Sequence, residues 1–447
     1  MKVSIIIPTY NRSNILKYTL SSLVDQDFPS REYEVIAIDD GSSDDTRAVV
    51  ESYKDKLNII YYFQEDRGFR VALARNEGIK RAKGDVLVFI DTGIVVGNTF
   101  VRTHYDAHYR NSVEKCADSN DKYAVIGYVF GFSYEHKEED LTPEFIDFER
   151  PNQMVQNLKL VDYYKDIREQ VYSLFNDDLN SIPIPWVLFY ANNVSVKRTD
   201  MLVAGCFDED FVRWGVEDIE CAYRLFKNNL KFKLSRAACG VHYPHERHID
   251  NKYISWRMNT RKFYDKYRDD VLELYTVSNP LKFLYEYLDY LSYKERLANV
   301  PLFSSLLTEE AVKLLSEEMP PKRNIIYGCQ DGFLLDVCKS VAATESDMEL
   351  ILKAREKHSD IEIYRSFGIR TPFRTKAYET ILIAGSGIVL TENFLNKLVF
   401  EAIRVSKKVY WLKVENGADL TEYEYSKVKD LGNGVTLYQI GNKISRQ

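Results

Sequence analysis

Three absences in the sequence exclude whole classes of protein. No apolar run approaches the ~20 residues of a membrane-spanning helix, and the N-terminal run Val3–Pro8 gives way at once to polar residues, unlike a signal peptide. Basic residues are not in excess: Lys and Arg number 60 against 67 Asp and Glu, and the net charge of −7 offers no electrostatic footprint for nucleic acid. The six cysteines form no CxxC pair, which predicts reduced thiols in a cytoplasmic protein.

Length and composition predict more than one folded part. The chain has 447 residues, well above the ~100–200 of an ordinary domain. With 45% hydrophobic and 28% charged residues, its composition is that of a folded protein. The periodicity changes character near residue 251. We therefore predict an α/β domain over residues 1–255, a helical linker over 256–320, and a second, smaller α/β domain over 321–447.

In the first hundred residues, short β-branched runs alternate with segments of helical spacing. The runs predict strands at Val3–Pro8, Glu34–Asp39, Asn58–Phe63 and Asp85–Ile90, and the segments between them predict helices at Ile15–Gln26, Asp45–Tyr53 and Val71–Ala82. This alternation predicts a mostly parallel sheet flanked by helices. Such sheets bind ligands outside the carboxyl ends of their strands. There the sequence places three polar clusters, Pro8–Arg12, Asp39–Ser42 and Asp91–Gly93.

Two polar features near these strand ends have competing interpretations. Asp39 and Asp40 can serve the turn before a helix capped by Ser42, or one of them can accept hydrogen bonds from a nucleoside. The second interpretation fits better for one of the pair.

Arg75 likewise has two interpretations. Its guanidinium can bind a phosphate through two parallel hydrogen bonds. Alternatively, it forms a surface ion pair with Glu77 or Asp66. Both interpretations stay open.

Four runs of the sequence, in their order along the chain, resemble the nucleotide-binding half of the family 2 glycosyltransferases, which have the GT-A fold. They are the runs Val3–Arg12, Ile38–Thr46, Ala74–Ile79 and Gly84–Asp91. The resemblance implies a UDP-linked sugar donor whose base is flanked by Pro8 and Tyr10 and contacted by Asp40. It also implies that Arg75 lies near the diphosphate. We add Arg12 and Gly68 to the predicted nucleotide-sugar site.

The resemblance further implies a divalent metal, Mn²⁺ or Mg²⁺, bound by an Asp-x-Asp motif that begins at Asp91. Here the motif reads Asp91-Thr92-Gly93, so one carboxylate is missing. A cation that bridges two phosphates needs few protein ligands, and imidazole suits Mn²⁺. His242 matches the position of the metal histidine in such enzymes, with His245 and His248 as alternatives.

The segment 204–220 contains Trp214-Gly215-Val216-Glu217-Asp218. Acidic residues at a helix start interact favourably with the helix dipole, so a structural role is part of the explanation. The run is also similar to the Trp-Gly-x-Glu-Asp element of galactosyltransferases and polypeptide N-acetylgalactosaminyltransferases. That resemblance implies that Asp218 is the general base and that Glu217 binds sugar or acceptor hydroxyls. Trp214 could stack on a sugar ring.

Together these residues predict an inverting hexosyl- or N-acetylhexosaminyltransferase. A carboxylate removes the proton of the acceptor hydroxyl while the diphosphate leaves from the opposite face. Asn193, with Asn192 beside it, could bind sugar hydroxyls, although turn asparagines are commoner. The stretch 135–180 matches no motif, so the saccharide, peptide or small-molecule acceptor is not identified.

Beyond residue 320 a second alternation begins. The run Ile325–Gly332 faintly resembles a nucleotide or S-adenosylmethionine loop, but the strand at Ile361–Tyr364 is not followed by an acidic residue. We favour a non-catalytic domain for acceptor docking or homo-oligomer contacts.

Two other functions remain as alternatives. One is an inactive carbohydrate-binding protein on the same scaffold, suggested by the missing second Asp. The other is a bifunctional protein whose C-terminal domain modifies the product.

Overall fold

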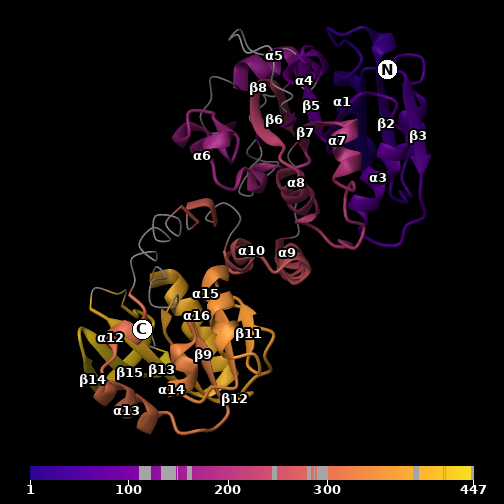
Figure 1. Cartoon of the computed structure of the whole chain (residues 1–447). Helices are drawn as coiled ribbons and strands as arrows, with labels where there is room; N and C mark the ends of the chain where they lie inside the picture. Colours follow the sequence, from indigo (N-terminus) through magenta and orange to yellow (C-terminus); the bar gives the residue numbers. More distant parts are fainter. Residues whose placement is uncertain are drawn as a thin grey trace. The chain divides into compact units, whose positions relative to one another are not determined.

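The computed structural model divides the chain into two units, Met1–Asn259 and Thr260–Gln447, drawn from indigo to dark red and from there to yellow in Figure 1. The limits predicted above, at 255 and 320, remain predictions. The residues described are 1–109, 122–131, 147, 149–158, 164–243, 249–278, 283–285, 287–288, 301–385, 392–415, 417 and 419–443.

The first unit is built on an eight-stranded sheet with the order β3-β2-β1-β4-β7-β6-β8-β5. The strands are β1 (Val3–Thr9), β2 (Tyr33–Asp39), β3 (Ile59–Phe63), β4 (Val86–Ile90), β5 (Ile94–Val96), β6 (Tyr123–Phe130), β7 (Asn193–Lys197) and β8 (Lys231–His242). β1 to β4 are parallel, β7 runs antiparallel to β4, and β8 is parallel to β6 but antiparallel to β5.

Helices cover both faces of this sheet. Those that pack against its strands are α1 (Ser13–Ser22), α2 (Thr46–Glu51), α3 (Val71–Arg81), α4 (Phe100–Tyr109), α5 (Pro151–Leu158) and α7 (Arg198–Val203). The unit also contains α6 (Glu169–Leu174), α8 (Glu217–Lys227) and the first part of α9 (Ile249–Tyr267), which continues past Asn259. Side chains alternate along a strand. Ile5 and Ile7 therefore join Leu16 of α1 in one buried cluster, whereas Ile6 faces α3, where a Cβ at Gly78 would collide with it.

The sheet curls back on itself. β4 ends at Ile90 and β5 begins at Ile94, yet β7, β6 and β8 lie between them in the sheet. Four residues span at most about 14 Å, whereas four strand spacings in a flat sheet cover about 19 Å. The sheet must therefore curl, which brings the carboxyl ends of β4 and β8 to one rim.

The predicted α/β fold is confirmed, and the strands and helices of the first hundred residues lie within a few residues of the predicted positions. β8 is longer than predicted: it continues past Leu234 to His242. Its middle residues Ser235, Arg236 and Ala237 are partly or fully exposed, so they carry no hydrophobic alternation that could have revealed the strand.

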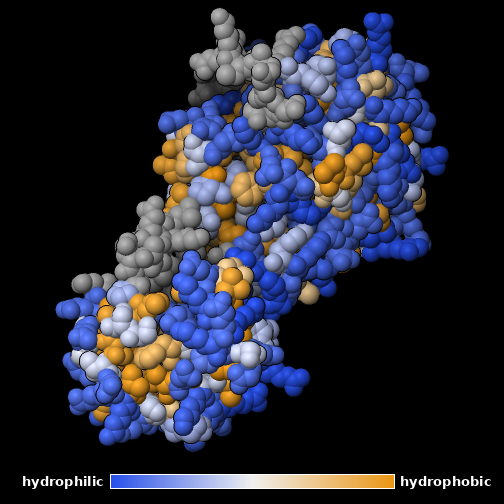
Figure 2. Space-filling view, in the orientation of Figure 1, coloured by the Kyte–Doolittle hydropathy of each residue, from blue (hydrophilic) through white to orange (hydrophobic). Residues whose placement is uncertain are grey.

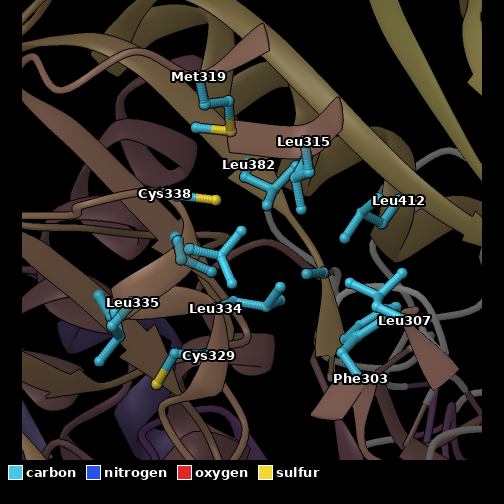
Figure 3. Close-up of a cluster of buried hydrophobic side chains, with 14 of the residues drawn as sticks. Phe303, Leu307, Leu315, Met319, Cys329, Leu334, Leu335, Cys338, Leu382 and Leu412 are labelled. Carbon is cyan, nitrogen blue, oxygen red and sulfur yellow. The ribbon is translucent and has the colours of Figure 1, made fainter. Parts of the chain in front are cut away.

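The second unit is another α/β sheet, with the order β11-β10-β9-β12-β13-β15-β14. Its strands are β9 (Asn324–Tyr327), β10 (Ala342–Glu345), β11 (Glu362–Arg365), β12 (Tyr378–Ile383), β13 (Ser406–Val414), β14 (Tyr423–Gly432) and β15 (Val435–Lys443), and its helices include α10 (Asp270–Tyr275), α12 (Phe303–Leu306), α13 (Glu309–Glu318), α14 (Phe333–Val337), α15 (Met348–Lys357) and α16 (Glu392–Val405). Figure 3 shows its core, where Phe303, Leu315, Leu334, Leu382 and Leu412 meet.

The surface agrees with the composition. Hydrophilic side chains cover most of the face drawn in Figure 2, with hydrophobic groups interspersed. Among the residues that the structure describes, no helix is long and apolar enough to cross a membrane.

Candidate active site

The loops that follow β1 and β2 are joined by hydrogen bonds. The hydroxyl of Ser42 accepts from the backbone N–H of Asn11 at 2.8 Å, and the Asp39 carboxylate closes its turn by accepting from the N–H of Ser42 at 2.7 Å. Asp39 therefore has the turn role. The predicted cap by Ser42 is wrong, because Asp44 is the residue that accepts from the N–H of Thr46 at the start of α2.

Asp40 lies at the same rim and is only 8% exposed. Its Oδ1 accepts from the Gln64 side chain at 2.5 Å and from the Arg70 guanidinium at 3.3 Å, and its Oδ2 accepts from the backbone N–H of Arg70 at 3.1 Å. Arg70 thus ties the end of β2 to the start of α3. Sequence patterns gave no sign of either partner, since both stand in a loop without periodicity.

Four other residues predicted to bind the nucleotide lie at the end of β1 or in the loop before α3. Tyr10 is 46% exposed, and its hydroxyl donates to Asp66 at 2.9 Å. Gly68 has a left-handed backbone (φ 84°), and its N–H donates to the other oxygen of Asp66. The Pro8 carbonyl accepts from the Thr92 hydroxyl at 2.9 Å, which joins the ends of β1 and β4. Arg12 immediately precedes α1, and its carbonyl accepts the first hydrogen bonds of that helix.

Arg75 of α3 links two acidic residues that are distant in sequence. Its Nη1 lies 2.9 Å from Oε1 of Glu217 and its Nη2 lies 3.1 Å from Oδ1 of Asp91. The guanidinium is buried, with 4% of the side chain exposed, whereas 41% of the Asp91 side chain is exposed. The surface ion pair with Glu77 or Asp66 is therefore wrong: the partners of Arg75 lie inside the unit.

α8 begins at this cluster: a strained residue precedes it, and its first residue, Glu217, is buried. Val216, immediately before the helix, has φ of 78°, which is unfavourable for a β-branched residue and commonest at functional sites. Burial, and then the charge of Asp218, raise the pKa of Glu217 to about 7. Burial also raises the pKa of Asp218, although its neighbour Arg75 opposes this.

Backbone amides fix the Asp218 carboxylate. Its Oδ2 accepts from the N–H of Ala191 at 3.0 Å, and its Oδ1 accepts from the N–H of Ile219 at 2.8 Å. Each oxygen keeps a further lone pair. The carboxylate is therefore oriented and can still accept a proton from a substrate.

Asn193 does not join the cluster. It is fully buried, and its amide donates to the carbonyl of Ala238 at 2.9 Å while its oxygen lies 2.9 Å from Nε2 of His104 in α4. The neighbouring Asn192 behaves differently: its carbonyl accepts from the N–H of Asp91 at 3.4 Å, and its side chain is 3% exposed.

The strand register places His242 next to the Asp91 loop. His242 is opposite Ile94 in the pairing of β5 with β8, and the N–H of Tyr243 donates to the Gly93 carbonyl at 2.8 Å. Within the described ranges, no three His, Cys, Asp or Glu side chains form a group that could hold a metal ion. One carboxylate and one imidazole fit an ion that takes its other ligands from a diphosphate and water. His245 and His248 lie outside the described residues.

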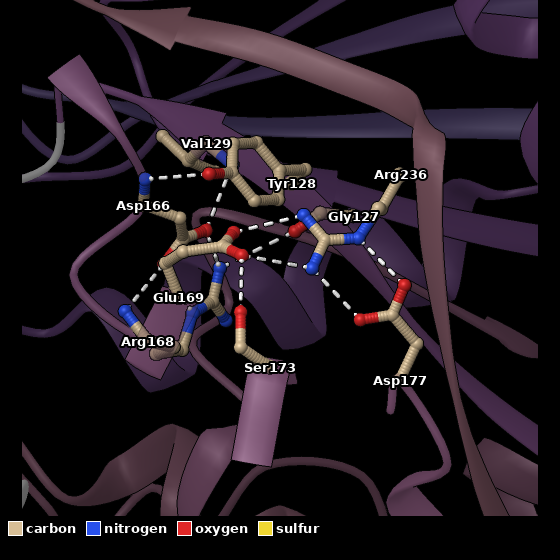
Figure 4. A network of polar contacts seen from close by, with 9 residues as sticks. All are labelled: Gly127, Tyr128, Val129, Asp166, Arg168, Glu169, Ser173, Asp177 and Arg236. Carbon is tan, nitrogen blue, oxygen red and sulfur yellow. Dashed lines mark hydrogen bonds and ion pairs between the residues drawn. The ribbon is translucent and has the colours of Figure 1, made fainter. Parts of the chain in front are cut away.

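A polar network with the fully buried ion pair of Arg168 and Asp166 supports the segment that leads to Ala191 (Figure 4). Arg168 is fully buried, binds both oxygens of Asp166 at 2.9 and 2.7 Å, and donates to the Leu188 carbonyl at 2.7 Å. Beside it, Arg236 of β8 binds Glu169 and Asp177. The sequence gave no motif in this region, because its role is to hold backbone rather than substrate.

Trp214 precedes the cluster in a loop that α9 fixes. The side chain of Asn259 donates to the carbonyl of Gly215 at 2.7 Å and to that of Arg213 at 3.0 Å. Trp214 itself is partly exposed. The loop is thus anchored on both sides of the tryptophan.

The second unit also has a glycine-containing loop, Gly328–Gly332, at the end of β9. The strand next to β9 is β10, and it ends in an acidic residue, Glu345. This acidic residue was expected after Ile361–Tyr364, but that strand is β11, which does not neighbour β9. The Glu345 carboxylate is buried, however, and accepts from the backbone N–H groups of Gln330, Ser346 and Asp347. Its hydrogen bonds hold the loop itself.

Known proteins resemble this chain in sequence. Residues 4–152 match the model of the glycosyl transferase family 2. The validoxylamine A glucosyltransferase of Streptomyces hygroscopicus subsp. jinggangensis is 32% identical over 390 residues, which are 85% of this chain and 90% of that protein. The uncharacterized glycosyltransferase YfnE of Bacillus subtilis is 31% identical over 283 residues, 60% of this chain and 71% of that one.

Among solved structures, Staphylococcus aureus TarS 1–349 in complex with UDP-GlcNAc is similar, with 18% identity, a TM-score of 0.42, and coverage of 71% of this chain and 81% of that one. The glucosyltransferase match extends over most of both proteins at more than 30% identity. On that ground, the chain belongs to the family 2 glycosyltransferases.

Proposed function

We propose that this glycosyltransferase inverts the anomeric configuration of a UDP-linked hexose or N-acetylhexosamine as it transfers the sugar to an acceptor hydroxyl. The observation that carries the proposal is the cluster around Arg75, which contacts Glu217 and Asp91 and so joins the start of α8 to the rim of β4. Residues that are far apart in sequence thereby meet at the strand ends, where ligands bind in such sheets.

Asp218 is the general base in this proposal. Its orientation is set by the N–H groups of Ala191 and Ile219, and burial raises its pKa toward that of a hydroxyl activated in the transition state. The sequence Trp214 to Asp218 resembles the acceptor-facing element of galactosyltransferases. We assign Glu217 to binding a sugar or acceptor hydroxyl, because its Oε2 is buried and has no hydrogen-bond partner among the described residues.

The leaving diphosphate is to be held by groups at the β4 rim. Asp91 and His242 would bind a divalent metal, which when bound would neutralise the charge of the departing phosphates. Arg75 keeps the Asp91 carboxylate in place and adds positive charge nearby. Pro8, Tyr10, Arg12, Asp40 and Gly68 would form the base and ribose side.

The names of relatives suggest the sugar class. One relative is a glucosyltransferase and another, 40% identical over 92 residues, is the poly(ribitol-phosphate) beta-N-acetylglucosaminyltransferase TarS. We therefore keep both hexose and N-acetylhexosamine as donors. For the second unit we propose acceptor docking rather than a second reaction, because Glu345 already satisfies backbone donors of its own loop.

The test is a screen of UDP-glucose, UDP-galactose and UDP-N-acetylglucosamine by thermal shift, with and without Mn²⁺, followed by assays of UDP release with added saccharide acceptors. Transfer of one sugar with inversion, seen by NMR of the product, is the expected result. Binding of saccharides without any UDP release would favour the inactive carbohydrate-binding alternative. Binding of S-adenosylmethionine by the full chain would instead favour a modifying second unit.

A further inference from the structure

Three consecutive residues, Ala191 to Asn193, link the Asp218 carboxylate to the backbone of Asp91, and each makes different contacts. The backbone N–H of Ala191 donates to Asp218, and Asn193 is anchored in the core of the unit by its side chain. Asn192, between them, accepts from the N–H of Asp91 through its backbone carbonyl. The backbone of all three residues is therefore fixed.

The side-chain amide of Asn192 is buried without a partner. Its side chain is enclosed, and neither Nδ2 nor Oδ1 makes a hydrogen bond to any residue that the structure describes. Buried polar groups in native proteins are nearly always hydrogen-bonded, so an exception calls for an explanation such as a ligand or a water molecule. An amide with both of its ends unsatisfied, at the rim of the proposed site, points to a ligand.

The fold indicates on which side of the sheet this amide lies. Successive side chains point to opposite faces of a strand, and Asn193 faces His104 of α4. The preceding residue therefore belongs with the opposite face. That face carries Asp91, whose carboxylate contacts Arg75 of α3.

The chemistry of the amide selects the ligand. A carboxamide offers two donors and one acceptor and carries no charge. A phosphate would use only the N–H donors of the amide and is better bound by Arg75 or a metal. Adjacent hydroxyls of a sugar ring provide both a donor and an acceptor, which matches the amide at both ends.

We propose that Asn192 binds two adjacent hydroxyls of the sugar that is transferred. This inference rests on the proposed function, since it takes Asp91 to mark the diphosphate side and Asp218 the acceptor side of that sugar. The buried Arg168 prepares the contact: it donates to the Leu188 carbonyl and lies 5.0 Å from the ring centre of Tyr190, so the backbone just before Ala191 is already in place.

The experiment compares the wild-type protein with Asn192→Ala and Asn192→Leu. Each is titrated with UDP and with the UDP-sugar that supports transfer, in the presence of Mn²⁺. We expect the affinity for UDP to stay within about twofold, and the affinity for the UDP-sugar and kcat/KM to fall about 10- to 100-fold, because only the sugar loses its neutral hydrogen bonds. Without ligand, Asn192→Leu should raise Tm, since it removes a buried amide that has no partner.

A matched control is Thr344→Val in the second unit, which removes a different buried polar group, a hydroxyl, that has no partner among the described residues. It should leave both affinities unchanged. Deoxy analogues of the donor sugar give a second test on the folded wild-type protein. One analogue should bind more weakly than the parent donor, and Asn192→Ala should bind the two equally.

The outcomes separate the two proposals. If the wild-type protein binds no UDP-sugar, the proposed function fails. If the wild type transfers sugar and Asn192→Ala retains its full preference for UDP-sugar over UDP, only the role of Asn192 is overturned. An equal loss of affinity for UDP and UDP-sugar would also overturn it, since the amide would then support Asp91 rather than contact the sugar.

Discussion

The guanidinium of Arg75 lies 2.9 Å from the carboxylate of Glu217, although 142 positions separate them in the chain. Both side chains are almost fully buried. Removing one partner of a buried ion pair costs about 3–5 kcal/mol, because the other charge is left uncompensated. The contact is thus both a structural link between α3 and α8 and a condition for the site.

We expect Arg75→Met to lower the free energy of unfolding by about 3–5 kcal/mol. The double variant Arg75→Met/Glu217→Gln should recover about 1–3 kcal/mol of this loss, since it leaves one less unpaired charge. Urea unfolding followed by circular dichroism measures both. The partly exposed pair of Arg81 and Glu77 on the same helix is the control, and the same cycle there should give a coupling of at most about 1 kcal/mol. Equal couplings at the two pairs would contradict the prediction.

Asp218→Asn should lower the transfer rate by about 10²- to 10⁴-fold, because the acceptor hydroxyl loses its proton acceptor. Binding of UDP should persist, since the amide keeps the shape of the side chain. Single-turnover transfer and calorimetric titration with UDP measure the two effects. Asp210→Asn, an exposed change in the same segment, serves as control. Near-normal turnover in Asp218→Asn would remove this residue from the role of base.

The pH profile should reflect the acidic pair at the start of α8. Because the pKa of Glu217 is raised to about 7, chiefly by burial, kcat/KM should rise with pH through an apparent pKa near 7. Glu217→Gln removes a neighbouring negative charge, so the remaining transition should move to lower pH. A profile that is flat between pH 5 and about 8 in the wild type would contradict this.

The same raised pKa has a consequence for stability. Between about 4.5 and about 7 the folded protein keeps a proton that the unfolded chain has lost. The contribution of Glu217 to the free energy of unfolding should therefore fall as pH rises through this window. Glu217→Gln should flatten that slope, which urea midpoints at several pH values can measure. An unchanged slope would place the proton elsewhere.

Asp91→Asn and His242→Ala should each weaken the Mn²⁺-dependent part of UDP binding by about 10- to 100-fold. Mutating residues that only hydrogen-bond to metal ligands already has an effect of this size. Calorimetry with UDP, in Mn²⁺ and in chelator, isolates this part without relying on turnover. Asp45→Asn, exposed at the start of α2, should bind as the wild type does. Unaltered Mn²⁺ dependence in His242→Ala would direct the search for a ligand to His245 or His248.

In the second unit, Glu273 of α10 is a buried carboxylate that accepts from the Ser366 hydroxyl and from the N–H groups of Phe367, Ile369 and Arg370. Glu273→Ala should lower the unfolding free energy by about 3 kcal/mol or more, as these donors would lose their acceptor. Hydrogen exchange should rise first at residues 366–370. Glu310→Ala, at an exposed position of α13, is the control.

The sequence predicted the parts of the fold that depend on local patterns. β1 to β4 have strong β-branched runs, and α1 and α3 have clear apolar spacing, so their positions came out nearly correctly. β10 has only four residues, Ala342–Glu345, which have no alternation that sets them apart from the helix before them. Short strands of this kind are defined by their neighbours in the sheet rather than by their own residues.

The site could be predicted only in its residue types. Motifs identified Asp91, Glu217 and Asp218, but not that Arg75 joins the first two, because that contact depends on how α8 packs against α3. The period of a strand indicates that Asn192 and Asn193 face opposite ways, yet not which of them faces the rim. Burial and hydrogen bonding decide it: Asn193 is satisfied in the core and Asn192 is not.

The curl of the first sheet bears on how the chain folds during synthesis. β5 follows β4 by only a few residues, yet it pairs with β8, which ends at His242. A nascent chain that has not yet emerged beyond residue 242 therefore leaves Ile94–Val96 without that partner. The rim that carries Asp91 should remain open in such fragments, and ribosome-bound chains should acquire resistance to proteases there only after β8 has left the exit tunnel.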